Sequence, residues 1–267
     1  MLNRTVTLTT DFGLRDSYTA AMKGVMLNVN PTLQFVDVTH LIGPQDVMEA
    51  AFVIKNMAPF FPAGTVHLAV VDPGVGTSRR PVALKHNEQW YVGPDNGLFS
   101  LVLNSQPPDE LVVLDKPSYW RTPSPSDTFH GRDIFSSVAA HIASGVSLDT
   151  LGSPIETLKP LHWALPIADQ QGVQGWVVHV DHFGNCITNI SKKLIHDQCN
   201  SLSVKCYVGS TIIASIKTTY NTVPTGEPLL LFNSHGLLEI AINTGNASEM
   251  LSIRKGSPVN IVFTDDC

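Results

Sequence analysis

Residues 66–76 read Val-His-Leu-Ala-Val-Val-Asp-Pro-Gly-Val-Gly, and this stretch decides the fold because an apolar run ends in a carboxylate and a glycine-containing loop. The run 66–71 is short, apolar and rich in β-branched residues, which is typical of a buried strand. Similar runs alternate with segments of helical period from residue 4 to about 150. The sequence therefore predicts strand–helix–strand units in an open, mostly parallel sheet covered on both faces.

The hydrophobic period locates the expected elements of this first region. Apolar residues that recur on one helical face predict helices over 17–28, 46–57 and 131–143. Short β-branched or apolar runs predict strands over 6–10, 33–38, 66–71, 82–84, 90–92 and 111–114.

The pattern changes near residue 151, where prolines and polar spacers replace long periodic elements. Further on, short strand candidates separated by turns lie at 175–180, 203–208, 211–216, 229–232, 237–242 and 259–263. We therefore expect an N-terminal α/β domain over 1–155, a linker over 156–172 and a smaller, all-β, barrel-like domain over 173–267.

Composition limits the classes of partner. The chain has 267 residues, of which 43% are hydrophobic and 15% charged, and its formal net charge is −6. No run of Lys and Arg is present, so we expect no nucleic-acid partner. The first residues lead straight into a strand-like pattern rather than a long apolar stretch, so we expect no membrane association and a cytoplasmic location.

Neither the cysteines nor the histidines have the spacing of a metal site. Cys186, Cys199, Cys206 and Cys267 form no C-x-x-C pair, and we expect them to be reduced, partly buried small hydrophobic residues. The ten histidines are scattered, and the H-x-x-D pattern from His130 to Asp133 is the only local arrangement that favours a metal. We therefore expect no metal and no cofactor.

Four short motifs carry the residues best suited to chemistry: T-T-D-F-G at 9–13, V-D-P-G-V-G-T-S-R-R at 71–80, F-H-G-R-D at 129–133 and D-H-F-G-N at 181–185. Three of them lie where a predicted strand gives way to a loop or helix. Because ligands of open α/β sheets bind outside the carboxyl ends of the strands, Asp11 and Asp72 are expected to face a common pocket. The alternative for each carboxylate is a helix N-cap.

The loop after Asp72 is compatible with more than one role. Its glycines allow a tight return that brings Asp72 close to Arg79, either as a functional pair or as an exposed ion pair worth about 0–1 kcal/mol. The loop lacks the lysine of a phosphate-binding loop. His130, at the start of a predicted helix, is either a packed or capping histidine or a catalytic one.

Taken together, these motifs, with G-P-D-N-G at 93–97 and N-S-x-G-x-L-E-I-A at 233–241, resemble the S-adenosyl-L-methionine (SAM) hydroxide adenosyltransferases, which are adenosine-forming SAM hydrolases. This family is related to fluorinating and chlorinating enzymes that attack the same substrate. The resemblance covers nearly the whole chain in the family's order. It implies an N-terminal α/β domain, a C-terminal β-barrel, and a homotrimer with active sites between subunits.

The resemblance also implies which residues act. The family's catalytic set falls on Asp72, Arg79 and His130, and water is the expected nucleophile because the halogenating relatives carry other residues at the carboxylate and imidazole positions. Ser234 matches a position near the methionine carboxylate, but His235 stands where the fluorinating enzyme has arginine. The other substrate positions are Asp11 at the ribose, Asp181 at the methionine amino group, Asn185 at adenine, and Asp16 and Ser17 near the methionine.

The reaction implied is displacement of methionine from the ribose 5′ carbon by water, which gives adenosine and L-methionine. The sulfonium is a good leaving group, so the difficulty lies in the nucleophile, because water has a pKa near 15.7. We assign Arg79 to lowering the pKa of that water, and His130 and Asp72 to proton acceptance and orientation, two roles that the sequence does not separate.

Aromatic residues at Phe12, Phe129 and Trp90 are candidates for dry walls of the pocket, with ordinary core packing as the alternative, and Asn96 is a candidate for holding the water in line. Two other functions remain open: a halogenating SAM nucleosidase, and a module that binds adenosine or SAM without turnover.

Overall fold

The computed structural model describes residues 4–161, 165–199 and 204–264. The chain divides into two compact units, residues 1–162 and 163–267. Among the described residues, no helix is both long and apolar enough to cross a membrane. The linker over 156–172 stays a prediction, and its residues 162–164 lie outside the described ranges.

The first unit alternates strands and helices as expected, with most boundaries within one or two residues of the prediction. In chain order its elements are β1 (Thr5–Thr10), α1 (Tyr18–Val29), β2 (Gln34–Thr39), α2 (Val47–Met57), η1 (Ala58–Phe60), β3 (Val66–Val70), β4 (Pro81–His86), β5 (Gln89–Pro94), α3 (Ser100–Leu103), β6 (Glu110–Val113), η2 (Pro117–Tyr119), η3 (Gly131–Phe135), α4 (Ser136–Ala143), α5 (Leu148–Leu151) and β7 (Ser153–Pro154).

The sheet of this unit is mixed, so the expectation of a mostly parallel sheet is not confirmed. Over residues 4–161 the strand order is β2-β1-β3-β5-β4-β6-β7, with three parallel pairings on one side and three antiparallel pairings on the other. The reason lies between β4 and β5, where Asn87 and Glu88 form a two-residue turn with φ angles of 50° and 61°. Such a turn reverses the chain and forces antiparallel pairing.

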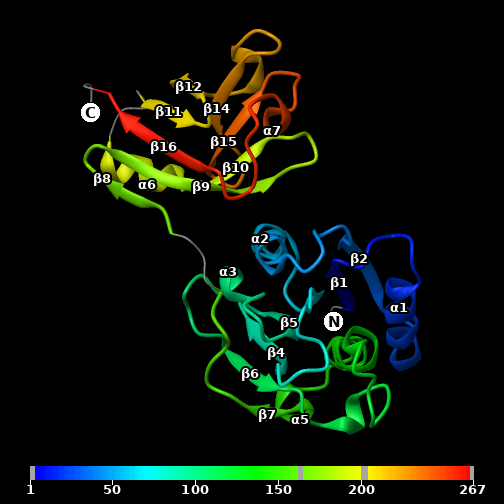
Figure 1. Cartoon of the computed structure of the whole chain (residues 1–267). Coiled ribbons are helices and arrows are strands. Elements are labelled where there is room, and N and C mark those ends of the chain that lie inside the picture. Colours follow the sequence, from blue (N-terminus) through cyan, green and yellow to red (C-terminus); the bar gives the residue numbers. More distant parts are fainter. Residues whose placement is uncertain (1–3, 162–164, 200–203, 265–267) are drawn as a thin grey trace. The chain divides into compact units, whose positions relative to one another are not determined.

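Helices cover both faces of this sheet (Figure 1). Along β3, Leu68 and Val70 pack in a core with Met22 and Met26 of α1 and with α4. The intervening Ala69 belongs to a second core with α2 and α3. Consecutive residues of a strand point to opposite faces, so β3 is buried on both sides, and its carboxyl end is held rigidly.

The beginning of the predicted linker is attached to the first unit rather than free. β7 pairs with β6, and Arg80 Nη2 donates to the Thr157 carbonyl at 2.8 Å. The backbone N–H groups of Lys159 and Leu161 donate to the Asp95 carboxylate at 2.7 Å and to the Ser100 hydroxyl at 2.9 Å. Hydrogen bonds with side chains therefore satisfy backbone groups of this proline-rich segment that no strand pairing satisfies.

The second unit is built on one strongly curved sheet that is nearly barrel-shaped (Figure 1). Within 165–199 and 204–264 its nine strands have the order β12-β11-β16-β9-β10-β15-β14-β13, with β8 paired to β9, and its pairings are antiparallel except β13 with β14. Its elements are β8 (Ile167–Asp169), β9 (Gly172–Val180), β10 (Cys186–Ser191), α6 (Lys192–Gln198), β11 (Val204–Val208), β12 (Thr211–Ala214), β13 (Ile216–Lys217), η4 (Tyr220–Thr222), β14 (Pro228–Phe232), β15 (Leu237–Ile242), α7 (Ala247–Met250) and β16 (Pro258–Phe263).

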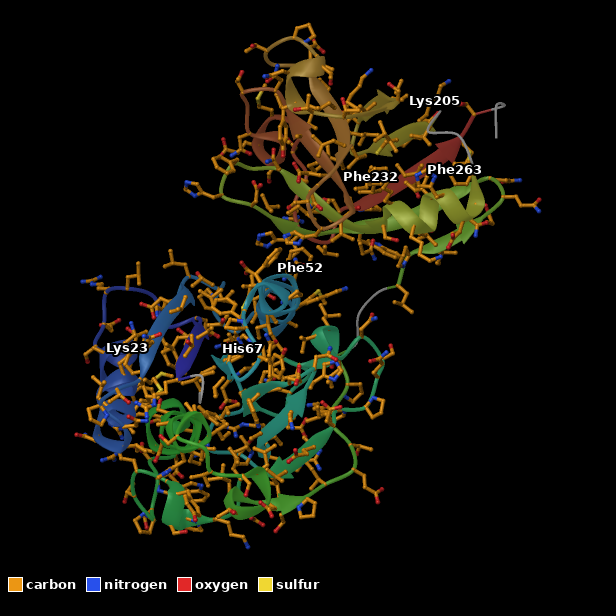
Figure 2. The ribbon with its side chains drawn as sticks, turned by 180° about the vertical axis from the view of Figure 1, so that it is seen from behind. Lys23, Phe52, His67, Lys205, Phe232 and Phe263 are labelled. Carbon is orange, nitrogen blue, oxygen red and sulfur yellow. The ribbon has the colours of Figure 1, made fainter. Side chains whose placement is uncertain are left out.

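The interior of this sheet is apolar, and Phe232 and Phe263, labelled in Figure 2, pack against it while partly buried. Several short elements of this unit, among them β8 and α7, were not predicted, and one cysteine differs from the expectation. β10 and α6 were not predicted either. Polar residues interrupt the apolar pattern of β10, although this strand is buried. Cys186 and Cys206 are free and buried, whereas Cys199 is disulfide-bonded, which corrects the expectation for that residue. Spacing along the chain excludes only short-range cysteine pairs.

A histidine lies in the middle of the first sheet (His67 in Figure 2). His67 is 1% exposed, its Nδ1 is 2.8 Å from the Thr7 hydroxyl, and its ring lies 4.9 Å from that of Tyr91. Burial lowers the pKa of His67 to about 4. The folded state therefore holds this ring neutral.

This buried ring predicts acid sensitivity. Below its ordinary pKa of 6.5, the unfolded chain binds a proton at His67 that the folded chain does not bind, so stability falls as pH falls toward about 4. Between about pH 7 and about pH 4.5 this one group should account for about 2–3 kcal/mol of lost unfolding free energy. Urea unfolding of wild type and His67→Gln at both pH values measures it, and parallel losses in the two proteins would contradict the assignment.

Candidate active site

A cavity of about 380 Å³ opens at the carboxyl ends of β1 and β3 in the first unit. These strands are parallel neighbours, so the residues that follow them emerge at the same edge of the sheet. Asp11 follows β1 and Asp72 follows β3. As the sequence predicted, both line one cavity, together with Phe12, Tyr18, Gln45, Val70, Pro73, Val75, Thr128, Phe129, His130 and Gly131.

One arginine connects the other predicted catalytic groups. Arg79 Nε donates to Asp72 Oδ1 at 3.0 Å, and Arg79 Nη2 donates to Asp72 Oδ2 in a short contact. The same Nη2 lies 3.0 Å from Nδ1 of His130. Only 7% of the Arg79 side chain and 6% of the Asp72 side chain are exposed. The structure thus brings the three predicted residues together in a largely desolvated cluster.

The contact between Arg79 and His130 fixes the proton on the imidazole. A guanidinium can only donate hydrogen bonds, so Nδ1 of His130 must accept and the neutral ring carries its proton on Nε2. Burial is the largest cause that lowers the pKa of His130, and the positive charge of Arg79 adds to it. The ring is therefore neutral at neutral pH.

The other two groups of the cluster have unusual electrostatics. Burial raises the pKa of the Asp72 carboxyl, although Arg79 and His130 oppose that rise. Nη1 of Arg79 is buried and has no hydrogen-bond partner among the described residues. An unmet buried donor costs about 1–3 kcal/mol, so an oxygen that accepts from it would be bound favourably.

The loop between Asp72 and Arg79 folds back through local hydrogen bonds. The Val75 N–H donates to the Asp72 carbonyl at 3.2 Å, and the Thr77 hydroxyl donates to the Gly74 carbonyl at 2.6 Å. Gly76 has φ +74°, and a Cβ built there would lie 2.3 Å from the Asp127 carbonyl oxygen. Only glycine allows this close approach between the loop that carries Arg79 and the segment that leads to His130.

The segment around His130 contains a buried carboxylate three residues further on, at Asp133. Asp133 is fully buried and accepts from Arg121 Nε at 2.5 Å, from Arg132 Nε at 2.7 Å and from the Ser126 N–H at 2.9 Å. It lies in η3, a π-helical turn, a geometry often found at functional sites. Its hydrogen bonds to these arginines lower the pKa of Asp133 against the effect of burial.

Asp133, the carboxylate of the H-x-x-D pattern, therefore has a structural role. Asp133 is occupied by two arginines and a backbone N–H, so it is not available as a partner of His130 for a metal. Among the described residues, no group of three or more His, Cys, Asp or Glu side chains is placed to hold a metal ion.

Aromatic rings form one wall of the cavity. Phe12, Tyr18 and Phe129 contact one another, with ring centroids 5.3–5.7 Å apart and tilted or edge-on geometry. Trp90 does not line the cavity, which corrects its suggested role, because it pairs with Val66 at the amino end of β3, whereas the cavity lies at the carboxyl end. The sequence did not single out Tyr18 for the site, since it matched the apolar face of a helix.

Asp11 is oriented by a residue that the sequence did not indicate. The Gln45 N–H donates to Asp11 Oδ2 at 2.8 Å, from a backbone with φ of 64°. The rare left-handed conformation of a non-glycine residue turns that N–H toward the carboxylate. Propensity patterns carry no signal for such a contact.

Four predicted residues of the first unit, Arg79, Asp16, Ser17 and Asn96, lie outside this cavity's lining. Asp16 and Ser17 are exposed in the turn before α1. Asn96 donates to the Val71 carbonyl at 2.9 Å and lines a neighbouring cavity of about 560 Å³ with Arg79 and Arg80. Its amide therefore supports the backbone that precedes Asp72.

The predicted residues of the second unit fall at two places. Asp181 accepts from Asn185 at both carboxylate oxygens, through the Asn185 backbone N–H at 2.9 Å and its Nδ2 at 2.9 Å. Asn185 lines a cavity of about 530 Å³ with the exposed ring of Phe183 and with Tyr220. Ser234 is exposed in the turn between β14 and β15.

Comparison with known sequences places this geometry in a family. The family model described as the SAM hydroxide adenosyltransferase N-terminal domain matches residues 6–152. The model of the corresponding C-terminal domain matches residues 175–260. The chain belongs to the SAM hydroxide adenosyltransferase family.

Members of this family and more distant relatives align over nearly the whole chain. A protein of Thermus thermophilus named (R)-S-adenosyl-L-methionine hydrolase is 39% identical over 97% of this chain and all of its own. A fluorinase of an Actinoplanes species is 26% identical over 97% of both. The crystal structure of an uncharacterized conserved protein from Thermotoga maritima, 35% identical, superposes with a TM-score of 0.91 over 96% of this chain and 99% of its own.

The close approach at Gly76 generates a prediction. Gly76→Ala adds a Cβ that collides with the Asp127 carbonyl at a φ unfavourable for alanine, so it should displace the segment before His130 and destabilise the fold by about 1–3 kcal/mol or more. Gly74→Ala is the matched control, because its Cβ would meet only ordinary contacts at 3.5 Å. Thermal unfolding and turnover of both variants test this, and equal behaviour of the two would show that the close approach is unimportant.

Proposed function

We propose that this chain hydrolyses SAM, with water displacing L-methionine at the ribose 5′ carbon to leave adenosine. Family membership and relatives named as SAM hydrolases support this function. The observation that carries the proposal is the buried contact of Arg79 with both Asp72 and His130, the two of these residues that line the cavity of about 380 Å³.

The proposed catalytic groups act on the attacking water, because the leaving group needs no assistance. The sulfonium departs as a neutral thioether, whereas the attacking water must lose a proton. A guanidinium beside that water favours its anionic form. We assign the unpartnered Nη1 of Arg79 to the water oxygen, since it is the buried donor that the cluster leaves unmet.

We assign the proton to Asp72 rather than to His130. Nδ1 of His130 is engaged with Arg79, and the remaining nitrogen, Nε2, carries a proton and can only donate. Each oxygen of Asp72 keeps a lone pair beyond its bond with Arg79, and burial makes the carboxylate a better base. His130 then holds Arg79 from one side and donates toward the cavity from the other.

Substrate recognition follows from the groups around the cluster. Asp11 is proposed to accept the two ribose hydroxyls, and the Phe12, Tyr18 and Phe129 rings to exclude water. Asp16, Ser17, Asp181 and Ser234 are proposed near the methionine portion. Asn185 is proposed to contact adenine, and the exposed Phe183 ring beside it offers a stacking surface.

The proposal extends to assembly, location and cofactors. The family resemblance supports a homotrimer with active sites between subunits, and we propose a cytoplasmic location for it. SAM is proposed as substrate and no cofactor is required, because the sulfonium supplies the activated carbon. The fluorinase relatives make halogenation the alternative outcome of the assay below.

Product identification tests the proposal. Purified protein treated with EDTA should convert SAM into equal amounts of adenosine and methionine, measured by chromatography against standards. Added fluoride or chloride should give no 5′-halogenated adenosine, because Asp72 and His130 are suited to activating water. Loss of activity with EDTA, a halogenated product, or adenosine binding with no SAM consumed over hours would each replace this function by another.

A further inference from the structure

The turn that carries Asp11 is held by a buried histidine to which no role has been assigned above. His40 follows β2 as Asp11 follows β1, and these strands are parallel neighbours. His40 is 4% exposed and Thr10 is fully buried, so their polar atoms can be satisfied only by each other and by their neighbours.

A chain of hydrogen bonds runs from the helix surface to this turn. Lys23 of α1, labelled in Figure 2, contacts Asp37 at 2.6 Å, and Asp37 Oδ1 lies 3.0 Å from Nε2 of His40. Nδ1 of His40 lies 2.8 Å from the Thr10 hydroxyl. The network therefore joins α1, β2 and the end of β1.

The direction of these bonds follows from donors and acceptors. The Asp37 carboxylate accepts, so Nε2 of His40 carries a proton, and Nδ1 shares a hydrogen bond with the Thr10 hydroxyl. The Thr10 oxygen then accepts from the Phe12 N–H at 3.3 Å. The His40 carbonyl accepts from the Gly13 N–H at 2.7 Å. His40 thus holds the two residues after Asp11, one through its side chain and one through its backbone.

We propose that His40 is a positioning residue for ribose recognition, acting through Thr10 to fix the turn that presents the Asp11 carboxylate. This inference rests on the proposed function, in which Asp11 accepts the two ribose hydroxyls. A carboxylate that must meet two hydroxyls at once depends on accurate placement, and a displacement of about 1 Å is costly. The Thr10 hydroxyl is the element that links the imidazole to the turn.

The role makes a prediction specific to the ligand. His40→Ala and Thr10→Val should each weaken adenosine binding at least about tenfold, measured by calorimetry, because Asp11 loses its fixed position. Binding of 2′,3′-dideoxyadenosine should change less than about threefold, since it has no hydroxyls for Asp11. In an Asp11→Ala background, His40→Ala should cause almost no further loss, which is the coupling expected of residues acting through one another.

Kinetics and a matched variant separate positioning from folding. His40→Ala should raise KM for SAM while kcat at saturation stays within about threefold, because the cluster around Arg79 is untouched. His86→Ala is the control, since His86 is equally buried at 4% but lies at the β4–β5 turn, at the opposite end of the sheet. It should leave the affinities for both nucleosides unchanged.

The contrary outcomes distinguish failure of the positioning role from failure of the proposed function. Equal losses of both nucleosides, additive losses in the Asp11→Ala background, or unchanged adenosine affinity in Thr10→Val would overturn the positioning role alone. If wild type neither binds adenosine nor consumes SAM, the proposed function fails and this inference fails with it. Thr10→Val keeps the side-chain shape, so it decides the matter even if His40→Ala does not fold.

Discussion

The guanidinium of Arg79 is the constraint on which the site depends. It meets both oxygens of Asp72 and Nδ1 of His130 in a region from which water is largely excluded. Charges in such a place are costly unless they are paired in good geometry, so the three side chains support one another's positions. The pairing also bears on the proposed chemistry, because Nδ1 of the imidazole accepts from Arg79 and the carboxylate is then the base that we propose.

Two structural features accompany the meeting of Asp72 and His130, which lie 58 positions apart along the chain. The first is the close approach at Gly76, where the loop after β3 lies against the Asp127 carbonyl. The second is Asp133, whose buried carboxylate holds Arg121, Arg132 and the Ser126 N–H around the turn that begins with Gly131. Neither Gly76 nor Asp133 needs to touch a substrate to determine where Arg79 and His130 meet.

The sequence predicted the parts of the site that follow from strand ends and short motifs. Asp11 and Asp72 share a cavity because parallel neighbours end at one edge, and the family resemblance indicated Arg79 and His130. It could not predict Gln45, whose contribution comes from an unusual φ, or His40, whose ring contacts Thr10. The suggested role of Trp90 was wrong because Trp90 lies near the beginning of its strand, whereas the cavity lies at the carboxyl ends of β1 and β3. The mixed sheet was missed because the turn at Asn87 and Glu88 was not recognised as a hairpin.

The most direct test of the central claim is the pH dependence of kcat/KM for SAM in wild type and Asp72→Asn. If Asp72 takes the proton, it must be ionised, so activity should fall as pH falls through a carboxyl pKa raised above 3.8, while His130, with a pKa lowered below 6.5, remains neutral at higher pH. Asp72→Asn should remove the carboxyl-dependent loss and lower kcat by about 10²–10⁴. An unchanged acid limb in Asp72→Asn, with kcat within about tenfold of wild type, would contradict the account.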